Sequence, residues 1–447
     1  MLAIAPARYG KISSMRLRSR FPMPLLIVFL LAPLSAEIRT LTILHLNDIH
    51  ARLTPLENGR GGFAYLAAAL DKERAGCHDC ILLNAGDLAQ GSPVSTMYKA
   101  MPVFELSRKL GINAATLGNH DFDYSWEQAK KLMAAAKYPI VSSNIVDGNG
   151  NLFAKKPWVI LRINGLRIGV LGAMTDELHN LAFPKHLGQW HTSSSVETAR
   201  KYAAELKAKC DLVVLVAHIT GPEEAAFLKE ANIPVIVSGH IHSGLEKALE
   251  SPGHVLVRVK SGGEELGRLE LKIDTQTKAP VSWTWKKIPV IDADYTPVPA
   301  VAALVKKWED KVAATVDRPL GFSGREYLRP EVKTMLEDAM KEATGAELSF
   351  MNAGGVRATL PKGPLLVRHA WNIMPFDNLV VYGQFKGRDL PAAVTAGHTI
   401  DPDKEYKVAV ADFIAQTMMP KLTFPNEAGL LRDALITHLQ KTMKARD

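Results

Sequence analysis

Short apolar runs of strand length alternate along the first part of the chain with longer segments of helical periodicity. The runs cover residues 41–46, 81–84, 112–117 and 212–217, and the helices expected after them cover 63–74, 94–110, 126–136 and 223–230. This alternation predicts an α/β domain whose active groups lie at the carboxyl ends of strands. Asn164-Gly165 indicates a hairpin between 158–163 and 166–171, and closing strands are expected at 255–259 and 267–273.

A change of pattern near residue 290 indicates a second, smaller domain. Prolines recur over 289–299, and an amphipathic helix is expected over 300–316. Beyond it we expect a helix at 331–344 and strands at 348–350, 379–382 and 406–410. With 447 residues the chain is too long for one ordinary core. We therefore expect a first domain at 37–295, a linker helix at 296–318 and a smaller α/β domain at 319–447.

Polar clusters follow five of the expected strands at the point where each strand ends. The densest, Asn119-His120-Asp121-Phe122-Asp123, follows Gly118 and combines an amide, an imidazole and two carboxylates. The others are Asn47-Asp48-Ile49-His50, Gly86-Asp87, Ala217-His218 and Ser238-Gly239-His240-Ile241-His242. A polar turn that caps the next helix through Asp123 or Ser125 would explain the first cluster alone. Five such turns in one chain are hard to explain as independent.

Each cluster also has a simpler explanation when it is considered alone. The spacing of Asp48 and His50 is common by chance, Asp87 after a glycine resembles a helix cap, and His218 at a strand end resembles a satisfied core histidine. The Gly-His-x-His pattern of residues 239–242 is more specific. Their joint occurrence favours one shared function.

Strand ends that meet at one sheet edge can present ligands to a metal from several directions. The candidate ligands are Asp48, His50, Asp87, Asn119, His218, His240 and His242. Imidazole, carboxylate and amide ligands suit Zn, Mn, Co or Fe, and the lack of thiolates in this set disfavours a closed structural zinc site. Asp87 can bridge two ions through its two oxygens. Two ions about 4 Å apart generate hydroxide at neutral pH and stabilise an in-line displacement at phosphorus.

Composition places the chain among soluble globular proteins, with 47% hydrophobic and 22% charged residues. The formal net charge of +8 overstates its basic character, because five of the positive charges lie before residue 37: Arg8, Lys11, Arg16, Arg18 and Arg20. Without them, 49 basic residues stand against 46 acidic ones. This balance excludes the footprint of a nucleic-acid-binding protein, so we expect no nucleic-acid partner.

Residues 1–36 have the pattern of a signal peptide, with a basic stretch, an apolar run at 21–34 and a small pair, Ser35-Ala36. The apolar run is shorter than the roughly 20 residues that a membrane span needs. We therefore expect a periplasmic or secreted protein, with an uncleaved anchor as the alternative. In an oxidising compartment Cys77 and Cys80 would form a local disulfide, but their spacing also fits free thiols, half a zinc site or a redox motif.

The ordered motifs resemble those of the calcineurin-like metallophosphoesterases, and within them the 5′-nucleotidase family with its C-terminal domain. The resemblance extends from Leu41 to about Val410, and it implies a four-layer α-β-β-α sandwich for the first domain. It implies that one metal takes Asp48, His50, Asp87 and His242, and that the other takes Asp87, Asn119, His218 and His240. It also implies that His120 is uncoordinated, is oriented by Asp123, and stabilises the transferring phosphoryl group or the leaving oxygen.

The second domain carries a pattern of anion recognition. Arg357 follows the turn Asn352-Ala353-Gly354-Gly355, in which glycines let backbone amides approach an anion and the guanidinium matches phosphate oxygens. Arg325 and Arg329 lie four residues apart, and solvated surface arginines are the alternative for this pair. The resemblance implies that these arginines, Asn352, Gly354, Gly355 and Arg357 bind substrate, and that Phe376 stacks on a base after the domain closes over the metals.

The chain departs from the family pattern after residue 397. Family members carry a long insertion there, and a Gly-Gly-Asp-Gly-aromatic motif follows the strand that corresponds to 406–410. Here residues 416–420 read Gln-Thr-Met-Met-Pro, so we expect the second stacking aromatic to be missing. Phe424 is the one candidate to take its place.

We therefore expect an exported dimetal phosphohydrolase that releases phosphate from nucleoside 5′-phosphates or related organic phosphates by metal-hydroxide attack in line at phosphorus. A sulfur-ester hydrolase of thiosulfohydrolase type is one alternative. A non-catalytic binding protein on the same fold is the other.

Overall fold

The computed structural model describes Gly10, residues 37–77 and residues 79–443. Except for Gly10, the expected signal peptide at 1–36 lies outside these residues. Within the described part of the chain, no helix is both long enough and apolar enough to cross a bilayer.

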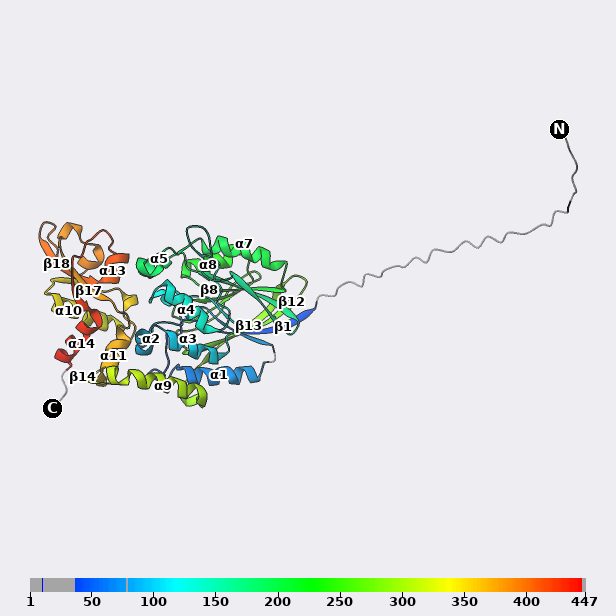
Figure 1. Ribbon diagram of the computed structural model, residues 1–447, viewed down its shortest axis with the longest axis horizontal. Helices are drawn as coiled ribbons and strands as arrows, with labels where there is room; N and C mark the ends of the chain where they lie inside the picture. The colour runs from blue at the N-terminus through cyan, green and yellow to red at the C-terminus, as the bar shows by residue number, and fades with distance from the viewer. Residues whose placement is uncertain (1–9, 11–36, 78, 444–447) are drawn as a thin grey trace, which may run out of the picture. The chain divides into compact units, whose positions relative to one another are not determined.

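Two stacked β-sheets form the centre of the first domain (Figure 1). The first sheet has the order β13 (Ala279–Pro289), β12 (Glu265–Asp274), β1 (Ile38–Leu46), β2 (Cys80–Asn84), β3 (Ala114–Ala115). The second has the order β10 (Leu249–Ser251), β11 (His254–Val257), β9 (Val235–Gly239), β8 (Leu212–His218), β6 (Leu166–Met174), β5 (Trp158–Ile163). Strands β1, β2 and β3 are parallel, and so are β6, β8, β9 and β11. The carboxyl ends of each parallel group therefore lie at one edge of its sheet.

Successive residues of each strand point into different cores, because side chains alternate across a strand. Ile43 of β1 and Val214 of β8 belong to the core between the sheets, whereas Leu44 and Leu215 belong to the cores on the outer faces. The outer face of the first sheet is covered by α1 (Phe63–Ala75), α3 (Met101–Ser107), α4 (Trp126–Ala136) and α9 (Pro299–Val316). The second sheet is covered by α7 (Ser195–Lys207) and α8 (Gly221–Glu230).

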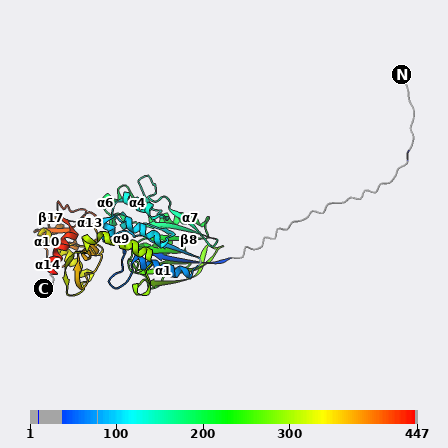
Figure 2. The same cartoon turned by 60° about the horizontal axis from the view of Figure 1, so that its bottom comes forward.

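Figure 1 shows α7 and α8 on one side of the sheets and α1 and α9 on the other, and the turned view of Figure 2 keeps α9 beside α1. The layers are helices, sheet, sheet and helices, which confirms the α-β-β-α sandwich. Short elements connect these layers: α2 (Pro93–Met97), η1 (Arg108–Leu110), η2 (Asn119–Phe122), β4 (Ile145–Val146), α5 (Leu178–Leu181), α6 (Pro184–Leu187), β7 (His191–Thr192) and η3 (Asp292–Asp294).

The smaller C-terminal part has its own sheet and its own hydrophobic core. Its sheet has the order β15 (Leu348–Phe350), β18 (Glu405–Ala411), β17 (Leu379–Lys386), β19 (Asn426–Leu430), and β14 (Pro319–Ser323) pairs with β16 (Gly363–Leu366). The helices are α10 (Arg329–Thr344), η4 (Ala353–Gly355), α11 (Val367–Ile373), η5 (Gly387–Asp389), α12 (Ala392–Thr395), α13 (Asp412–Thr417) and α14 (Leu431–Thr442). This confirms a second, smaller α/β domain, whereas its boundaries at 319 and 447 stay a prediction.

Two expected elements differ from the structure. The single helix expected over 94–110 is broken into α2, α3 and η1, because Lys99 and Ala100 have φ angles of 48° and 61°, which no right-handed helix contains. The strand expected over 112–117 pairs only at Ala114 and Ala115, and its end becomes the loop before η2. Helices α7 and α14 and strand β13 were not predicted from the sequence.

The expected linker helix packs within the first domain. Buried Val301, Val305 and Val312 of α9 share the core of α1.

The hairpin at Asn164-Gly165 is confirmed between β5 and β6, and both turn residues have positive φ, as its sequence requires. Cys77 and Cys80 are joined by a disulfide, which excludes the free thiols and the half zinc site, while Cys210 is buried and free.

Candidate metal centre

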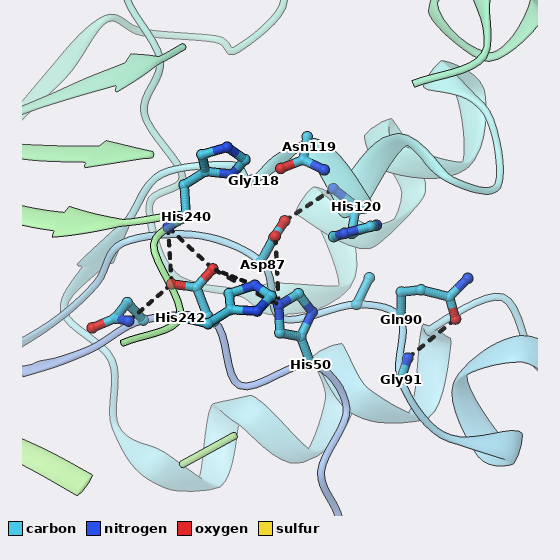
Figure 3. A network of polar contacts seen from close by, with 12 residues as sticks. His50, Asp87, Gln90, Gly91, Gly118, Asn119, His120, His240 and His242 are labelled. Carbon is cyan, nitrogen blue, oxygen red and sulfur yellow. Dashed lines mark hydrogen bonds and ion pairs between the residues drawn. The ribbon is translucent and has the colours of Figure 1, made fainter. Parts of the chain in front are cut away.

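Four parallel strands direct the candidate ligands to one place between the two sheets. Asp48 and His50 follow β1, and Asp87 follows β2. His218 ends β8 and His240 follows β9. Figure 3 shows His50, Asp87 and His242 gathered near Asn119 and His120. Side chains more than 190 residues apart thus meet at the carboxyl edge, where parallel sheets bind ligands.

The backbone at this edge is strained in a way that aims the side chains. Asp48, His50, Asp87 and His240 have φ angles of 51°, 50°, 52° and 80°, in the left-handed region that residues other than glycine rarely adopt. Gly118 lies so close to Asp87 Oδ1 that a Cβ atom there would overlap the carboxylate. Strain of this kind persists where the surrounding structure fixes a functional geometry.

The first ligand group consists of Asp48, His50, Asp87 and His242, whose ligand atoms all lie within 4.8 Å of one another. The Nε2 atoms of His50 and His242 are 2.9 Å apart. Nε2 of His50 lies 3.8 Å from Asp48 Oδ1 and 3.8 Å from Asp87 Oδ2. Two imidazoles and two carboxylates that converge from separate strands form a set that suits a divalent transition metal.

A second ligand group shares Asp87. Nε2 of His218 lies 3.2 Å from Asp87 Oδ2 and 3.1 Å from Asn119 Oδ1. The His240 ring contacts the His218 ring at a centroid distance of 5.0 Å, and the His240 backbone amide donates to both carboxylate oxygens of Asp48. His218 and Asn119 thus adjoin the first group through Asp87, and His240 contacts His218 through its ring.

The chemistry of these groups fits bound cations. Nδ1 of His218 donates to the carbonyl oxygen of Ala85 at 2.8 Å, which directs Nε2 toward the oxygens of Asp87 and Asn119. A carbonyl bond of this kind typically orients a metal-ligating histidine. Burial raises the pKa of Asp48 to about 6. Burial lowers the pKa of His218, but the carboxylates of Asp87 and Asp48 raise it more strongly, to about 9. The buried carboxylates therefore favour positive charge in this pocket.

His120 and Asp123 form a dyad beside the ligand groups. Nδ1 of His120 lies 2.8 Å from Asp123 Oδ2, and the His120 backbone amide donates to Asp87 Oδ1 at 2.9 Å. Burial lowers the pKa of His120, but the carboxylates of Asp123 and Asp87 outweigh it, so the pKa lies above its ordinary value. The imidazolium form is therefore favoured, and Asp123 fixes the ring through Nδ1.

The C-terminal domain contributes side chains beside the dyad and the first ligand group. Nη2 of Arg357 lies 3.1 Å from Nε2 of His50, and the ring of Phe376 stacks on His120 at a centroid distance of 5.6 Å. Asn352, Gly354 and Gly355 line the same cavity as His120, Arg357 and Phe376. Its volume is about 520 Å³. A guanidinium, a glycine turn and an aromatic ring thus face the dyad across one cavity.

The other two predicted substrate residues lie outside this cavity's lining. Arg325 is exposed, forms an ion pair with Glu331 and stacks on Tyr327. Nη2 of Arg329 donates to the backbone carbonyl of Arg357 at 2.9 Å. Arg329 thus supports the position of Arg357, and Arg325 holds the start of α10.

The cavity also contains residues that the sequence did not single out. They are Gln90, Lys99, Tyr124, Phe183, Lys185, His186, Asn378, Asp412 and Phe413. Phe413 corrects the expectation of a missing second aromatic, because its ring lines the cavity together with Phe376. The ring comes from the first turn of α13, directly after β18, and not from the segment after residue 416. Phe424 instead packs against Phe385.

Two family models match the chain in the order of its two parts. A model for the calcineurin-like phosphoesterases matches residues 41–244. A model for the 5′-nucleotidase C-terminal domain matches residues 312–396. The first match contains all the ligands and the dyad, and the second contains Arg357 and Phe376.

Relatives with similar sequences include nucleotidases and an endonuclease. The chain is 25% identical over 400 residues to Endonuclease YhcR of Bacillus subtilis, covering 80% of this chain but only 32% of that protein. It is 26% identical over 416 residues to the 5′-nucleotidase of Vibrio cholerae, covering 78% of this chain and 74% of the relative.

A solved structure shares the fold over nearly its full length. The 5′-nucleotidase precursor of Thermus thermophilus superimposes with a TM-score of 0.82 at 20% identity, covering 92% of this chain and 97% of that one. The chain thus has both parts of the family architecture and a ligand cluster at the expected sheet edge. It belongs to the 5′-nucleotidase family of calcineurin-like phosphoesterases, which are metal-dependent phosphoester hydrolases.

Proposed function

We propose that this protein is an exported dimetal phosphohydrolase that releases phosphate from nucleoside 5′-phosphates or related organic phosphates. The observation that carries the proposal is the pair of ligand groups that meet at Asp87, with the His120–Asp123 dyad beside them. Asp48, His50, Asp87 and His242 would hold one divalent cation. Asp87, Asn119, His218 and His240 would hold the other.

Bound divalent cations supply Lewis acidity toward a phosphoryl oxygen and a nucleophile at neutral pH. The side chains of the protein supply the remaining functions. Arg357 lies next to His50 and can bind phosphoryl oxygens through its guanidinium fork. The His120 imidazolium, held by Asp123, stabilises negative charge on the phosphoryl group and donates its Nε2 proton to the leaving oxygen.

The cavity favours a leaving group with a flat ring. Phe376 and Phe413 both line it, and stacking on aromatic rings contributes about 1–3 kcal/mol per base. Asn352, Gly354 and Gly355 lie beside Arg357, where backbone amides can contact an anion. A nucleotide combines both features, whereas a simple phosphate ester has only one of them.

Export is a separate part of the proposal, supported by the basic and apolar pattern of residues 1–36. Expression of the full chain with fractionation is the test. A mature protein in the extracellular or periplasmic fraction, with its amino terminus near Glu37, is expected. A full-length protein in the cytoplasmic fraction would reject export.

Metal ligation is tested by alanine substitutions at the shared and buried ligands. Asp87→Ala and His218→Ala are expected to abolish hydrolysis and to lower the metal content of the purified protein by one or two ions, because each removes a ligand that no neighbour replaces. Elemental analysis and phosphate release measure the two effects. Asp294→Ala and His191→Ala, at exposed positions outside the site, serve as matched controls. Full activity in either ligand variant would contradict the assignment.

Substrate class is tested with a panel on the metal-loaded wild type, after chelation and reconstitution with Mn, Zn, Co or Fe. The panel contains nucleoside 5′-phosphates, an aryl phosphate, a thiosulfonate ester and a single-stranded oligonucleotide. The highest kcat/KM is expected for a nucleoside 5′-phosphate. A preference for the thiosulfonate or the oligonucleotide would replace the nucleotide proposal, and metal loading without any hydrolysis would identify a binding protein.

A further inference from the structure

Asp412 is a buried carboxylate in the wall of the substrate cavity, and none of the roles above uses it. It begins α13 directly after β18 and immediately precedes Phe413. Its side chain is nearly inaccessible, with 8% of the residue's surface exposed, yet it lines the cavity together with Phe376 and Phe413. The carboxylate therefore borders the space beside the two rings.

All the hydrogen bonds that the structure gives to this carboxylate go to one of its oxygens. The Asn378 side-chain amide donates to Asp412 Oδ1 at 3.0 Å, and the backbone amides of Leu379 and Phe413 donate to the same atom at 3.1 and 2.8 Å. Among the described residues, no donor is bonded to Oδ2. The three bonds fix the orientation of the carboxylate, and they leave one acceptor oxygen for a ligand.

A purely structural role accounts for only half of this geometry. Oδ1 satisfies backbone amides at the start of α13 and β17, as a capping residue does. A capping role does not account for the second oxygen, to which no donor of the described residues is bonded in a residue that lines the cavity. Burial raises the pKa of Asp412 above its ordinary value. The three hydrogen bonds and the charge of Lys185 on α6 lower this pKa but do not outweigh burial.

We infer that Asp412 Oδ2 accepts a hydrogen bond from an N–H or O–H donor of the nucleoside leaving group, which makes Asp412 a specificity-determining residue. The inference rests on the proposed nucleotidase function. A base that contacts Phe376 and Phe413 presents its in-plane edge beside them, and the amino or imino groups on that edge are donors. The ribose hydroxyls are the second possible source of the same donor.

The first experiment uses the metal-loaded wild-type protein and needs no variant. Adenosine 5′-phosphate and purine riboside 5′-phosphate differ only in the 6-amino group, so their kcat/KM ratio measures a base N–H donor. Adenosine 5′-phosphate and its 2′-deoxy and 3′-deoxy analogues measure the sugar donors in the same way. At least one ratio is expected to favour the donor by about tenfold or more, the size of a hydrogen bond to a charged group.

The second experiment repeats these ratios in Asp412→Asn. The amide oxygen of asparagine can keep the three bonds to Oδ1, while its NH₂ group replaces the free acceptor by a donor. The ratio that favours the donor in the wild type is expected to fall to about one or below. Because each ratio compares two substrates in one preparation, loss of folded enzyme does not change it. Asp433→Asn is the matched control, since Asp433 is exposed on α14 and is not part of the cavity lining, and its ratios should stay within about twofold of wild type.

The outcomes separate this inference from the proposed function. A changed amino-group ratio supports a base donor, and a changed deoxy ratio supports a sugar donor. Ratios near one in the wild type, or equal ratios in wild type and Asp412→Asn, would overturn the inference while leaving nucleotide hydrolysis intact. Hydrolysis of the aryl phosphate without any nucleotide hydrolysis would overturn both.

Discussion

At the scale of single residues, His120 and Arg357 are the groups to which the proposed function assigns roles other than metal binding. His120 contacts Asp123 and Phe376, and its backbone amide, not its ring, bonds to Asp87. Arg357 comes from the other domain and reaches His50. Neither side chain is needed to complete either ligand group, so a change at His120 should separate turnover from metal content.

His120→Asn is expected to keep both metals and to lower kcat by about 10²–10⁴-fold, the usual contribution of a positioned acid. Elemental analysis and steady-state kinetics on the same preparation measure the two effects. Asp123→Asn provides a second readout: because the Asp123 carboxylate raises the pKa of His120, its removal should move the alkaline limb of the pH–rate profile to lower pH. Undiminished turnover in His120→Asn would refute the assigned role.

At the scale of elements, β1 carries a buried histidine that makes the first sheet sensitive to acid. Nε2 of His45 accepts a hydrogen bond from Trp285 Nε1 on β13 at 2.9 Å, and Gly267 of β12 leaves room for the ring because it has no Cβ. Protonation would add a hydrogen to Nε2, and that hydrogen would face the hydrogen of the indole N–H group. Burial lowers the pKa of His45 to about 3.

The pKa of His45 is lower in the folded state than in the unfolded state, so the folded protein binds this proton less readily. The stability contributed by the neutral ring is complete above the unfolded pKa of about 6.5 and is lost as the pH falls toward 3. Between pH 7.5 and pH 5, this one group should lower the free energy of unfolding by about 2 kcal/mol. Urea unfolding at both pH values measures it in wild type and in His45→Gln, whose amide oxygen keeps the acceptor. An equal pH dependence in the two proteins would show that His45 has no such effect.

At the scale of the whole molecule, the site depends on contacts between the two domains. Beyond Arg357 and Phe376, the hydroxyl of Thr96 donates to the backbone carbonyl of Pro375 at 2.8 Å. Thr96 lies at the end of α2, and Pro375 immediately precedes Phe376, so this buried bond positions the ring that stacks on His120. The arrangement that places substrate groups over the ligands is therefore supported by a hydrogen bond outside the cavity.

Thr96→Val keeps the shape of the side chain and removes its hydroxyl, leaving the Pro375 carbonyl oxygen without this donor. A lost buried hydrogen bond of about 1–2 kcal/mol should lower kcat/KM for a nucleotide by roughly 5–30-fold, with the metal content unchanged. Thr437→Val removes a hydroxyl on the exposed side of α14 and serves as the control. A kcat/KM equal to that of the control would show that the bond does not contribute to the active arrangement.

The sequence by itself determined the α/β class, the order of most elements and the residues that could serve as ligands. Apolar runs report burial directly, and ligand chemistry is local to each strand end, as for Asp48 and His50 after β1. The hydrophobic pattern did not predict the break of the helix at Lys99. That break follows from the left-handed backbone of Lys99 and Ala100 and not from side-chain polarity.

Only the tertiary structure decided which groups share a cavity. Phe413 and Asp412 lie in a segment without a glycine signature, and only the pairing of β18 with β17 places them beside Phe376. Arg325 and Arg329 are both arginines and lie four residues apart. Arg325 nevertheless pairs with Glu331, whereas Arg329 donates to the backbone carbonyl of Arg357. Spacing along the chain fixes which side chains can serve one site, whereas strand pairing and domain contact fix which of them do.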